Sequence, residues 1–288
     1  MAIEGLTVIG ESINDSVPST KKLFEAGDID GIMELARFQE EKGAAYIDVN
    51  VGLRSPGFMA DLVKKVQDVT TKPLSIDTPD VELAAAGLEA YDPERAGGKL
   101  PILNSISPTR LDMFDIYAAQ PFMPILLSSE HVVNGDSRPN RTGSKNYESA
   151  RFHLQEAHAR CAIPNDQCIF DPGIAPIGSD TEGINKMVFD CLRLMHEDTD
   201  FQGAHRSVGL SNFTVMIPPK RADGSPVKSP LESAFLTLAM PLGLDTVIGS
   251  VKRKYRLLEP ENDAMVCLNE ALAAQGHNCI IRIMEFYT

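Results

Sequence analysis

Several features that are common in other classes of protein are scarce in this sequence of 288 residues. Lys and Arg number 27 against 40 Asp and Glu, a net charge of −13, which disfavours nucleic acid as a main partner because phosphate binding needs cations. The five cysteines are odd in number and widely spaced, which indicates a reducing compartment without disulfides. No apolar run approaches the roughly 20 residues that cross a bilayer, and the first residues lack a signal-peptide pattern. We expect a cytoplasmic protein that binds neither nucleic acid nor membrane.

Chemistry that depends on histidine, cysteine or lysine also finds little support. The sequence has no H-x-x-x-H or C-x-x-C pair, the spacings typical of metal ligands. It has no nucleophile elbow, and no glycine-rich phosphate loop follows a strand-like run. No lysine ends such a run, which disfavours Schiff-base chemistry. The sequence therefore predicts a site without a metal ion and without a covalent nucleophile.

Eight short apolar runs recur along the chain, each about five residues long, as expected for parallel strands that are covered on both faces. They are TVIGES (7–12), AYIDVN (45–50), LSIDT (74–78), PILNSI (101–106), MPILLSS (123–129), CIFDPG (168–173), SVGLSN (207–212) and DTVIGS (245–250). Amphipathic stretches separate them, such as a helix that Asp28 caps and Gly43 ends. Eight strand–helix units predict an α/β fold, a single (β/α)8 TIM barrel. A doubly wound open sheet is the competing interpretation.

The segments between the strands carry no composition shift that would mark a domain boundary. Residues 130–149 are polar and predict a loop within the domain, and residues 217–230, rich in Pro and Gly, predict a second, mobile loop. Residues 1–288 are therefore expected to form one domain.

The predicted strands share a further property, because seven of the eight end in polar residues. The candidates at the strand ends are Glu11 with Asn14, Asp48 with Asn50, Asp77, Asn104, Ser128 with Glu130, Asp171 and Asn212. In a (β/α)8 barrel these ends converge on one mouth, where active sites of this fold lie. Each residue alone could simply form a turn or cap the next helix.

Carboxylates and amides without cations suit a neutral, flat heterocycle that carries several N–H groups. One carboxylate can accept two adjacent N–H donors of an aminopyrimidinone ring, and an Asn side chain can donate and accept in the same plane. Buried acids without partners are costly, so a ligand or water must satisfy them.

Six motifs carry a resemblance to a known family. They are GESIN (10–14), DVNVG (48–52), SIDT (75–78), LNSIS (103–107), FDPGI (170–174) and GLSNFT (209–214). Together they resemble the pterin-binding methyltransferases, and most closely the methyltetrahydrofolate:corrinoid protein methyltransferase type. The resemblance runs from the first predicted strand to the seventh.

The resemblance implies a methyl transfer between N5 of tetrahydrofolate and the cobalt of a corrinoid. Tetrahydrofolate or 5-methyltetrahydrofolate would be the substrate, and the cobalamin would be carried by a partner corrinoid protein. The enzyme would be a homodimer. By motif, the residue near N5 would be Asn212, the pterin anchors would be Asp77, Asn104 and Asp171, the floor would be Asp48 and Asn50, and Glu11 and Asn14 match the first-strand motif.

Three segments depart from the family pattern and are expected to face the corrinoid partner: residues 15–22, residues 213–216 and the end of the eighth predicted strand, IGSVKRK (248–254), which lacks a clear acidic ligand. A basic stretch, VKRKYR (251–256), overlaps the last of these. The basic stretch is either a solvated surface or a docking patch for an anionic tail or an acidic partner. The departures favour transfer from the corrinoid to tetrahydrofolate, as the last step of a demethylating system.

Four alternatives remain open. One is transfer from methyltetrahydrofolate to a corrinoid iron–sulfur protein in acetyl-CoA metabolism. Another is dihydropteroate synthase, for which only Lys220 and Arg221 could supply the cationic pocket that a pyrophosphate leaving group needs. The third is a folate binder without catalysis. The fourth is that the polar strand ends only form turns and caps.

Overall fold

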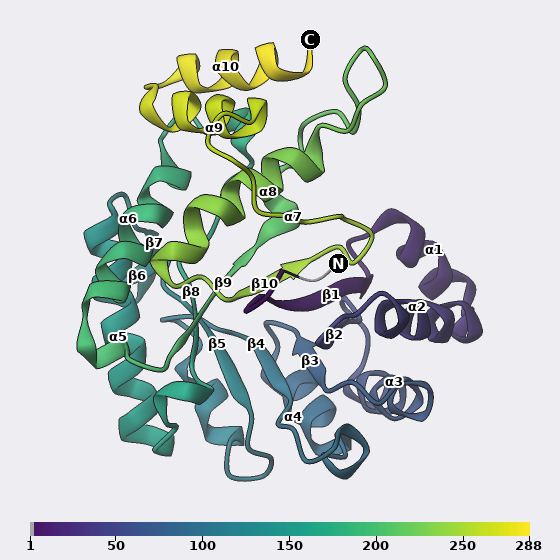
Figure 1. Ribbon diagram of the computed structural model, residues 1–288. Helices are drawn as coiled ribbons and strands as arrows, with labels where there is room; N and C mark the ends of the chain where they lie inside the picture. Colours follow the sequence, from purple (N-terminus) through teal and green to yellow (C-terminus); the bar gives the residue numbers. More distant parts are fainter. Residues whose placement is uncertain (1–2) are drawn as a thin grey trace.

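The computed structural model describes residues 3–288 and shows a closed barrel of eight parallel strands (Figure 1). Around the barrel the strands follow the order β1, β10, β9, β8, β5, β4, β3 and β2. Their bounds are β1 (Thr7–Asn14), β2 (Tyr46–Asn50), β3 (Leu74–Asp77), β4 (Ile102–Ile106), β5 (Met123–Leu127), β8 (Ile169–Asp171), β9 (His205–Gly209) and β10 (Thr246–Gly249). Each of the eight apolar runs supplies one strand, and the predicted (β/α)8 barrel is confirmed.

Helices surround the barrel between successive strands (Figure 1). They are α1 (Pro18–Ala26), α2 (Ile29–Glu41), α3 (Pro56–Val69), α4 (Val81–Ala90), α5 (Gly143–Cys161), α6 (Ile184–Glu197), α7 (Leu210–Phe213), α8 (Lys228–Ala239), α9 (Asp263–Ala273) and α10 (His277–Tyr287). After β4 a 3-10 segment, Leu111–Ile116, takes the place of a helix. Asp28 caps α2 as predicted, since its Oδ1 accepts the N–H of Gly31 over 2.9 Å. No helix among residues 3–288 has the length and apolarity that crossing a membrane requires.

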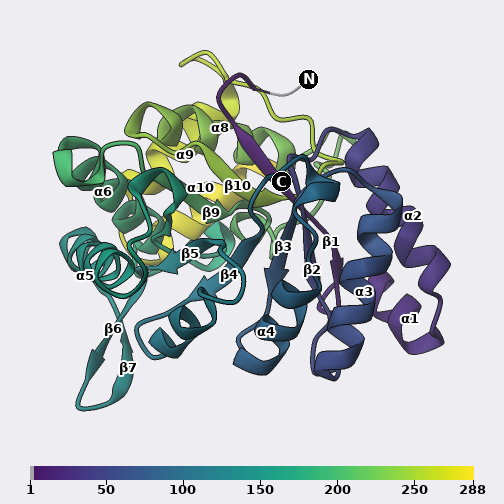
Figure 2. The ribbon, with the colours of Figure 1, turned by 90° about the horizontal axis from the view of Figure 1, so that it is seen from below.

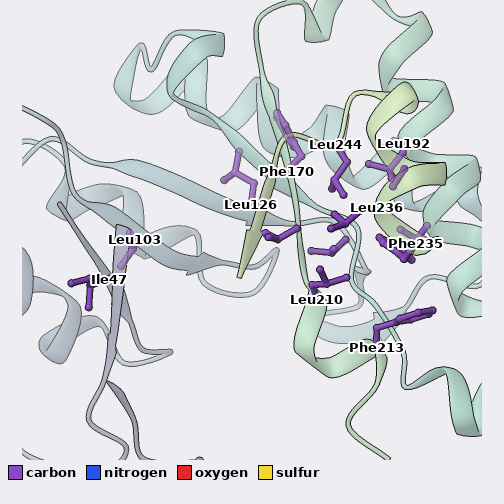
Figure 3. Close-up of a cluster of buried hydrophobic side chains, with 14 of the residues drawn as sticks. Ile47, Leu103, Leu126, Phe170, Leu192, Leu210, Phe213, Phe235, Leu236 and Leu244 are labelled. Carbon is purple, nitrogen blue, oxygen red and sulfur yellow. The ribbon is translucent and has the colours of Figure 1, made fainter. Parts of the chain in front are cut away.

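The core has two apolar layers because side chains alternate across each strand. Inside the barrel, four isoleucines pack together, one from each of β1, β4, β5 and β8: Ile9, Ile102, Ile125 and Ile169. Outside it, the opposite strand faces pack against the helices, as Figure 3 shows for Ile47 and Leu103 from the strands and for Phe213 and Phe235 from the helices. The inner layer fills the barrel, so polar side chains nearer the carboxyl ends of the strands stand above an apolar floor.

The prediction of a polar loop at residues 130–149 is wrong. An antiparallel hairpin of β6 (Glu130–Val133) and β7 (Asp136–Pro139) fills its first half, and α5 begins at Gly143. Asn134 and Gly135 connect the two strands with φ angles of 53° and 88°, the left-handed backbone that an Asn-Gly hairpin turn requires. The hairpin projects on the side toward which the barrel strands point (Figure 2).

The three segments that depart from the family pattern lie in different surroundings. Residues 15–22 form a turn and the first half of α1. The basic stretch 251–256 runs along the outside of the barrel, where Lys252 lies 5.6 Å from the ring of Phe38 in α2 and Arg253 contacts α8. Residues 251–255 line a cavity of about 530 Å³ together with residues at the start of β1 and in the segment that precedes β2. The expectation that this part of the chain faces a partner stays a prediction.

Candidate functional site

A set of carboxylates and amides lines the barrel at the carboxyl ends of the strands. Four members of this set directly follow a residue that is buried in the outer apolar layer. Those preceding residues are Ile47, Ile76, Leu103 and Phe170. Because neighbouring side chains on a strand point to opposite faces, the next residue along each strand points into the barrel. Those residues are Asp48, Asp77, Asn104 and Asp171. The strand alternation therefore brings four of the predicted site residues to the inner face.

Asp48 on β2 is linked by hydrogen bonds to the neighbouring part of the barrel. The hydroxyl of Ser75 donates a hydrogen bond of 2.6 Å to Oδ1 of Asp48, and Nδ2 of Asn104 lies 3.5 Å from the same oxygen. The other oxygen, Oδ2, is buried and has no hydrogen-bond partner among the described residues. Beside this group, Nδ2 of Asn50 donates to Oδ2 of Asp77 over 2.9 Å. Strands β2, β3 and β4 are thus joined by one polar cluster.

The two acids of this cluster, Asp48 and Asp77, are better able to share one proton than to be ionised together. Burial raises the pKa of Asp48 well above its usual value, and the nearby charge of Asp77 raises it further. Burial also raises the pKa of Asp77, against which the hydrogen bond from Asn50 and the charge of Arg110 act in the opposite direction. A carboxyl that is kept neutral can donate a hydrogen bond as well as accept one. The cluster can therefore offer both donors and acceptors to a flat ring above it.

Asp171 forms the opposite side of the site, between β8 and β9. Its Oδ1 accepts the N–H of Gly173 over 2.8 Å, and Ser207 donates to its Oδ2 over 3.4 Å. Burial raises the pKa of Asp171 to about 6, although both hydrogen bonds lower it. Near neutral pH this side chain is a buried acceptor with no cationic partner among residues 3–288, which suits a ligand with N–H donors.

Asn212 lies above the end of β9 rather than on it. The strand ends at Gly209, and Asn212 belongs to the one-turn helix α7, so the prediction that the strand runs to Asn212 is wrong. Its side chain is exposed, and its Nδ2 would lie 2.9 Å from a Cβ placed on Gly209. The amide therefore folds back over the strand end at the edge of the mouth.

Glu11 and Asn14 have separate surroundings at the end of β1. Glu11 accepts a hydrogen bond from the hydroxyl of Ser211 in α7. Asn14 is the register partner of Asn50 on the neighbouring strand, and its Oδ1 accepts the N–H of Ser16 over 2.8 Å. Glu11 thus connects to the helix of Asn212, whereas the side-chain oxygen of Asn14 forms a local turn.

The segment after Asn212 divides between core and surface. Phe213 is fully buried, with its ring centroid 5.1 Å from that of Phe235 (Figure 3). The expectation that Phe213 faces a partner is wrong. Val215 and Met216 have exposed fractions of 57% and 68%, so the exposed part of this segment begins beyond Thr214.

Helix capping does not explain the strand-end acids. Asp80 caps α4, with Oδ1 accepting the N–H groups of Glu82 and Leu83, so Asp77 is not needed for this purpose. Ahead of α6, Asp180 accepts the N–H groups of Ile184 and Asn185. Asp171 makes one turn-type bond, to Gly173, and still has its other oxygen inside the barrel.

Two serines that support these acids were not among the predicted site residues. Ser75 and Ser207 donate to Asp48 and Asp171 from neighbouring strands. The two-residue period of a strand gave a signal for Ser75, because it precedes Asp77 by two positions and so points to the same face.

Comparison with known proteins assigns the class. Residues 13–249 match the family of pterin binding enzymes, and the chain belongs to this family. The resemblance expected from the six motifs is confirmed.

One characterised relative is the methylcorrinoid:tetrahydrofolate methyltransferase of Eubacterium limosum, which is 28% identical over 257 residues and covers 84% of each chain. Among solved structures, the dihydropteroate synthase of Xanthomonas albilineans has a TM-score of 0.57 at 17% identity, over 84% of this chain and 86% of that one. The dihydropteroate synthase of Thermus thermophilus has a TM-score of 0.57 at 16% identity, over 95% and 93%. At these identities the two structures share the fold.

Proposed function

We propose that this protein is a methyltransferase that moves a methyl group from a protein-bound methylcorrinoid to N5 of tetrahydrofolate. The observation that carries the proposal is the ring of inward-facing carboxylates and amides at the mouth, of which Asp48 and Asp171 are buried. The relative from Eubacterium limosum, whose name contains both reactants, supports the same activity.

The pterin ring is held by the inward-facing acids. Asp77, Asn104 and Asp171 are the anchors in this proposal, with Asp48 and Asn50 forming the floor beneath the ring. Asp171 is well suited to the paired N–H donors of the aminopyrimidinone edge, since Gly173 and Ser207 hold the carboxylate in place while it lacks a cation. The apolar floor of isoleucines below excludes water from the lower face of the site.

The reaction needs one bond to form as another breaks. The lone pair of N5 attacks the methyl carbon, and the cobalt–carbon bond breaks with its electron pair remaining on cobalt, which passes from Co(III) to Co(I). N5 becomes positively charged and then loses its proton to water. The amide of Asn212 can accept a hydrogen bond from N5, and this bond strengthens as the charge develops, which is the interaction that raises the rate. The remaining acceleration comes from alignment of N5, methyl and cobalt.

The physiological direction is proposed as corrinoid to tetrahydrofolate, the last step of a demethylating system. The name of the relative supports this direction. The reverse transfer, to a corrinoid iron–sulfur protein, would use the same residues because both directions share one transition state. The proposal also includes a homodimer and a corrinoid protein that approaches the mouth, where Val215 and Met216 are exposed.

Dihydropteroate synthase chemistry is less well supported by this chain. It would need a cationic pocket for the leaving group, and of the two candidates Lys220 and Arg221 the second is engaged elsewhere: its guanidinium lies 3.8 Å from the ring of Phe286 in α10 and pairs with Asp263 in α9. These helices lie outside the barrel (Figure 1).

The test is anaerobic absorbance spectroscopy of methylcobalamin mixed with tetrahydrofolate and the protein, followed by the reverse pair. Loss of methylcobalamin with formation of cob(I)alamin is expected only when folate is present. In the variant Asn212→Ala the turnover should fall by roughly 10- to 1000-fold, the range for one positioned polar group, while tetrahydrofolate still binds.

Unchanged turnover in Asn212→Ala would remove Asn212 from the mechanism. Firm binding of tetrahydrofolate without methyl transfer, tested also with a corrinoid protein as donor, would mean a folate binder without catalysis.

A further inference from the structure

Helix α7 is held on both sides of Asn212 by hydroxyl groups that donate to carboxylates. Ser211 donates to Glu11 on β1, and Thr214 donates to Glu232 on α8. The two acids lie far apart in the sequence, and the bonds hold the four-residue helix α7 through Ser211 within it and Thr214 at its C-cap. Asn212 lies between the two hydroxyl groups and has an exposed side chain.

Glu232 in turn is paired with the basic stretch. Its side chain is fully buried, and its Oε2 lies 3.3 Å from Nε of Arg253. Burial raises the pKa of Glu232, whereas the hydrogen bond from Thr214 and the charge of Arg253 lower it. A buried carboxylate needs such a partner, because an unpaired charge in the interior is strongly destabilising. Arg253 therefore keeps Glu232 available as the acceptor for Thr214.

A helix of four residues cannot hold its own position, since one turn fixes several dihedral angles for a single backbone hydrogen bond. The position of α7 must come from outside contacts. Phe213 provides one by packing in the apolar layer against Phe235, and the hydroxyl groups of Ser211 and Thr214 provide the others. Three points of attachment, at residues 211, 213 and 214, surround Asn212, the residue of α7 whose side chain is exposed.

We propose that the chain of contacts from Arg253 through Glu232 to Thr214, together with the contact of Ser211 with Glu11, positions Asn212 for methyl transfer. Arg253, Glu232 and Thr214 are positioning residues, which act on the reaction from behind α7 without touching the pterin. The inference rests on the proposed function and gives the basic stretch a role inside the enzyme, in place of a docking patch.

The two variants Thr214→Val and Thr214→Ser separate positioning from packing. Valine keeps the shape of threonine but lacks the hydroxyl group, whereas serine keeps the hydroxyl group and loses a methyl group. Both leave the ion pair of Glu232 and Arg253 in place, so the fold is preserved. Thr214→Val should lower turnover about 10- to 100-fold, the cost of a small misplacement of a reacting group. Thr214→Ser should retain turnover within a few-fold.

The affinity for tetrahydrofolate, measured by calorimetry without any corrinoid, should be the same in both variants, because the proposed pterin anchors lie on β3, β4 and β8. A split in which turnover falls and folate affinity stays is the signature of positioning. Equal turnover in the two Thr214 variants, or a fall in affinity that parallels the fall in turnover, would overturn the inference.

Charge removal at one position of the basic stretch gives a second test. Arg253→Gln should reduce turnover, whereas Lys252→Gln is a matched control because Lys252 stacks on Phe38 at the outside of α2. A loss of similar size in both variants would contradict the inference. Absence of methyl transfer by the unaltered protein, with either free or protein-bound corrinoid, would instead refute the proposed function, so the two failures remain distinct.

Discussion

The amide of Asn50 donates a hydrogen bond of 2.9 Å to Oδ2 of Asp77, and thereby ties the end of β2 to the end of β3. The oxygen of the same amide accepts the N–H of Gly52 over 2.9 Å, so both polar ends of Asn50 are engaged. The orientation of Asp77 is consequently fixed by its neighbour before any ligand binds. Asp77 keeps its second oxygen for a ligand, and Asn50 contributes by holding Asp77 in place.

The first prediction concerns this second oxygen. Asp77→Asn replaces a carboxylate, which only accepts hydrogen bonds, by an amide, which also donates them. We expect the affinity for tetrahydrofolate to fall by about 10- to 100-fold, which corresponds to the free energy that hydrogen bonds to a charged group contribute. The melting temperature should change little. Isothermal titration calorimetry measures the first quantity and differential scanning calorimetry the second.

Asp80→Asn is the matched control, because asparagine caps helices as well as aspartate does and Asp80 lies at the start of α4. If Asp77→Asn bound folate with unchanged affinity and lost only stability, Asp77 would have a structural role and no part in binding.

The second prediction concerns pH. Since the pKa of Asp171 in the ligand-free protein is about 6 and the ligand's N–H donors require the ionised carboxylate, protons compete with the pterin. Affinity should weaken as pH falls through 6, by up to about tenfold per pH unit for one group. Stability of the ligand-free protein has the opposite sign: a raised pKa contributes stability that is present at low pH and is lost as pH rises through about 6.

Folate affinity measured between pH 5 and pH 8 tests this, with Asp171→Asn as the control. The variant should bind weakly with a flatter pH profile, because the groups that remain, Asp48 and Asp77, titrate in both proteins. An identical pH profile in the variant and the unaltered protein would show that Asp171 does not set the pH dependence.

The barrel was predictable because its signals are local and repeated. Each strand is a short apolar run with a polar residue at its carboxyl end, and the period of two assigns Asp48, Asp77, Asn104 and Asp171 to one face once the barrel closes. The hairpin turn Asn134–Gly135 also had a local signal, and it was missed because most of the residues in the two short strands beside it are polar.

The support of α7 could not be predicted in the same way. Ser211 meets Glu11 across 200 positions of sequence, and Thr214 meets Glu232 and then Arg253. No spacing rule connects these residues, since their contact depends on how α8 packs and on the path of the chain after β10. The buried position of Phe213 likewise follows from its packing against Phe235.

The third prediction concerns Asp48, whose pKa is raised well above its usual value by burial and by Asp77. Because this pKa is higher in the folded protein than in the unfolded chain, the contribution of Asp48 to stability decreases as the pH rises above the unfolded value. Asp48→Asn retains an oxygen for the hydroxyl of Ser75 and gains a donor toward Asp77. We expect the melting temperature to rise at pH 7 to 8, with the gain vanishing toward pH 4.

Thermal unfolding at several pH values measures this, with Asp61→Asn on the exposed face of α3 as the control. A variant that is less stable than the unaltered protein at pH 8 would mean that Asp48 is ionised in the folded state, and would remove the shared proton from the description of the site.

The fourth prediction concerns Gly209, whose φ of −73° is open to any residue. A Cβ at this position would lie 2.9 Å from Nδ2 of Asn212. Among residues 3–288, apart from the two chain neighbours of Gly209, it would otherwise come within 4 Å only of Cγ of the same side chain. Gly209→Ala should therefore displace the amide of Asn212 at little cost to the fold. Turnover should fall by about 10- to 100-fold, as expected when a reacting group is misplaced by a fraction of an ångström to an ångström.

Folate affinity and melting temperature should stay close to those of the unaltered protein. Gly57→Ala is the control, because a Cβ there meets nothing within 4 Å and the position lies in α3, where alanine favours the helix. If Gly209→Ala turned over at the normal rate, the amide of Asn212 would not need the position in which the structure places it, and the role proposed for α7 and its supporting contacts would fail with it.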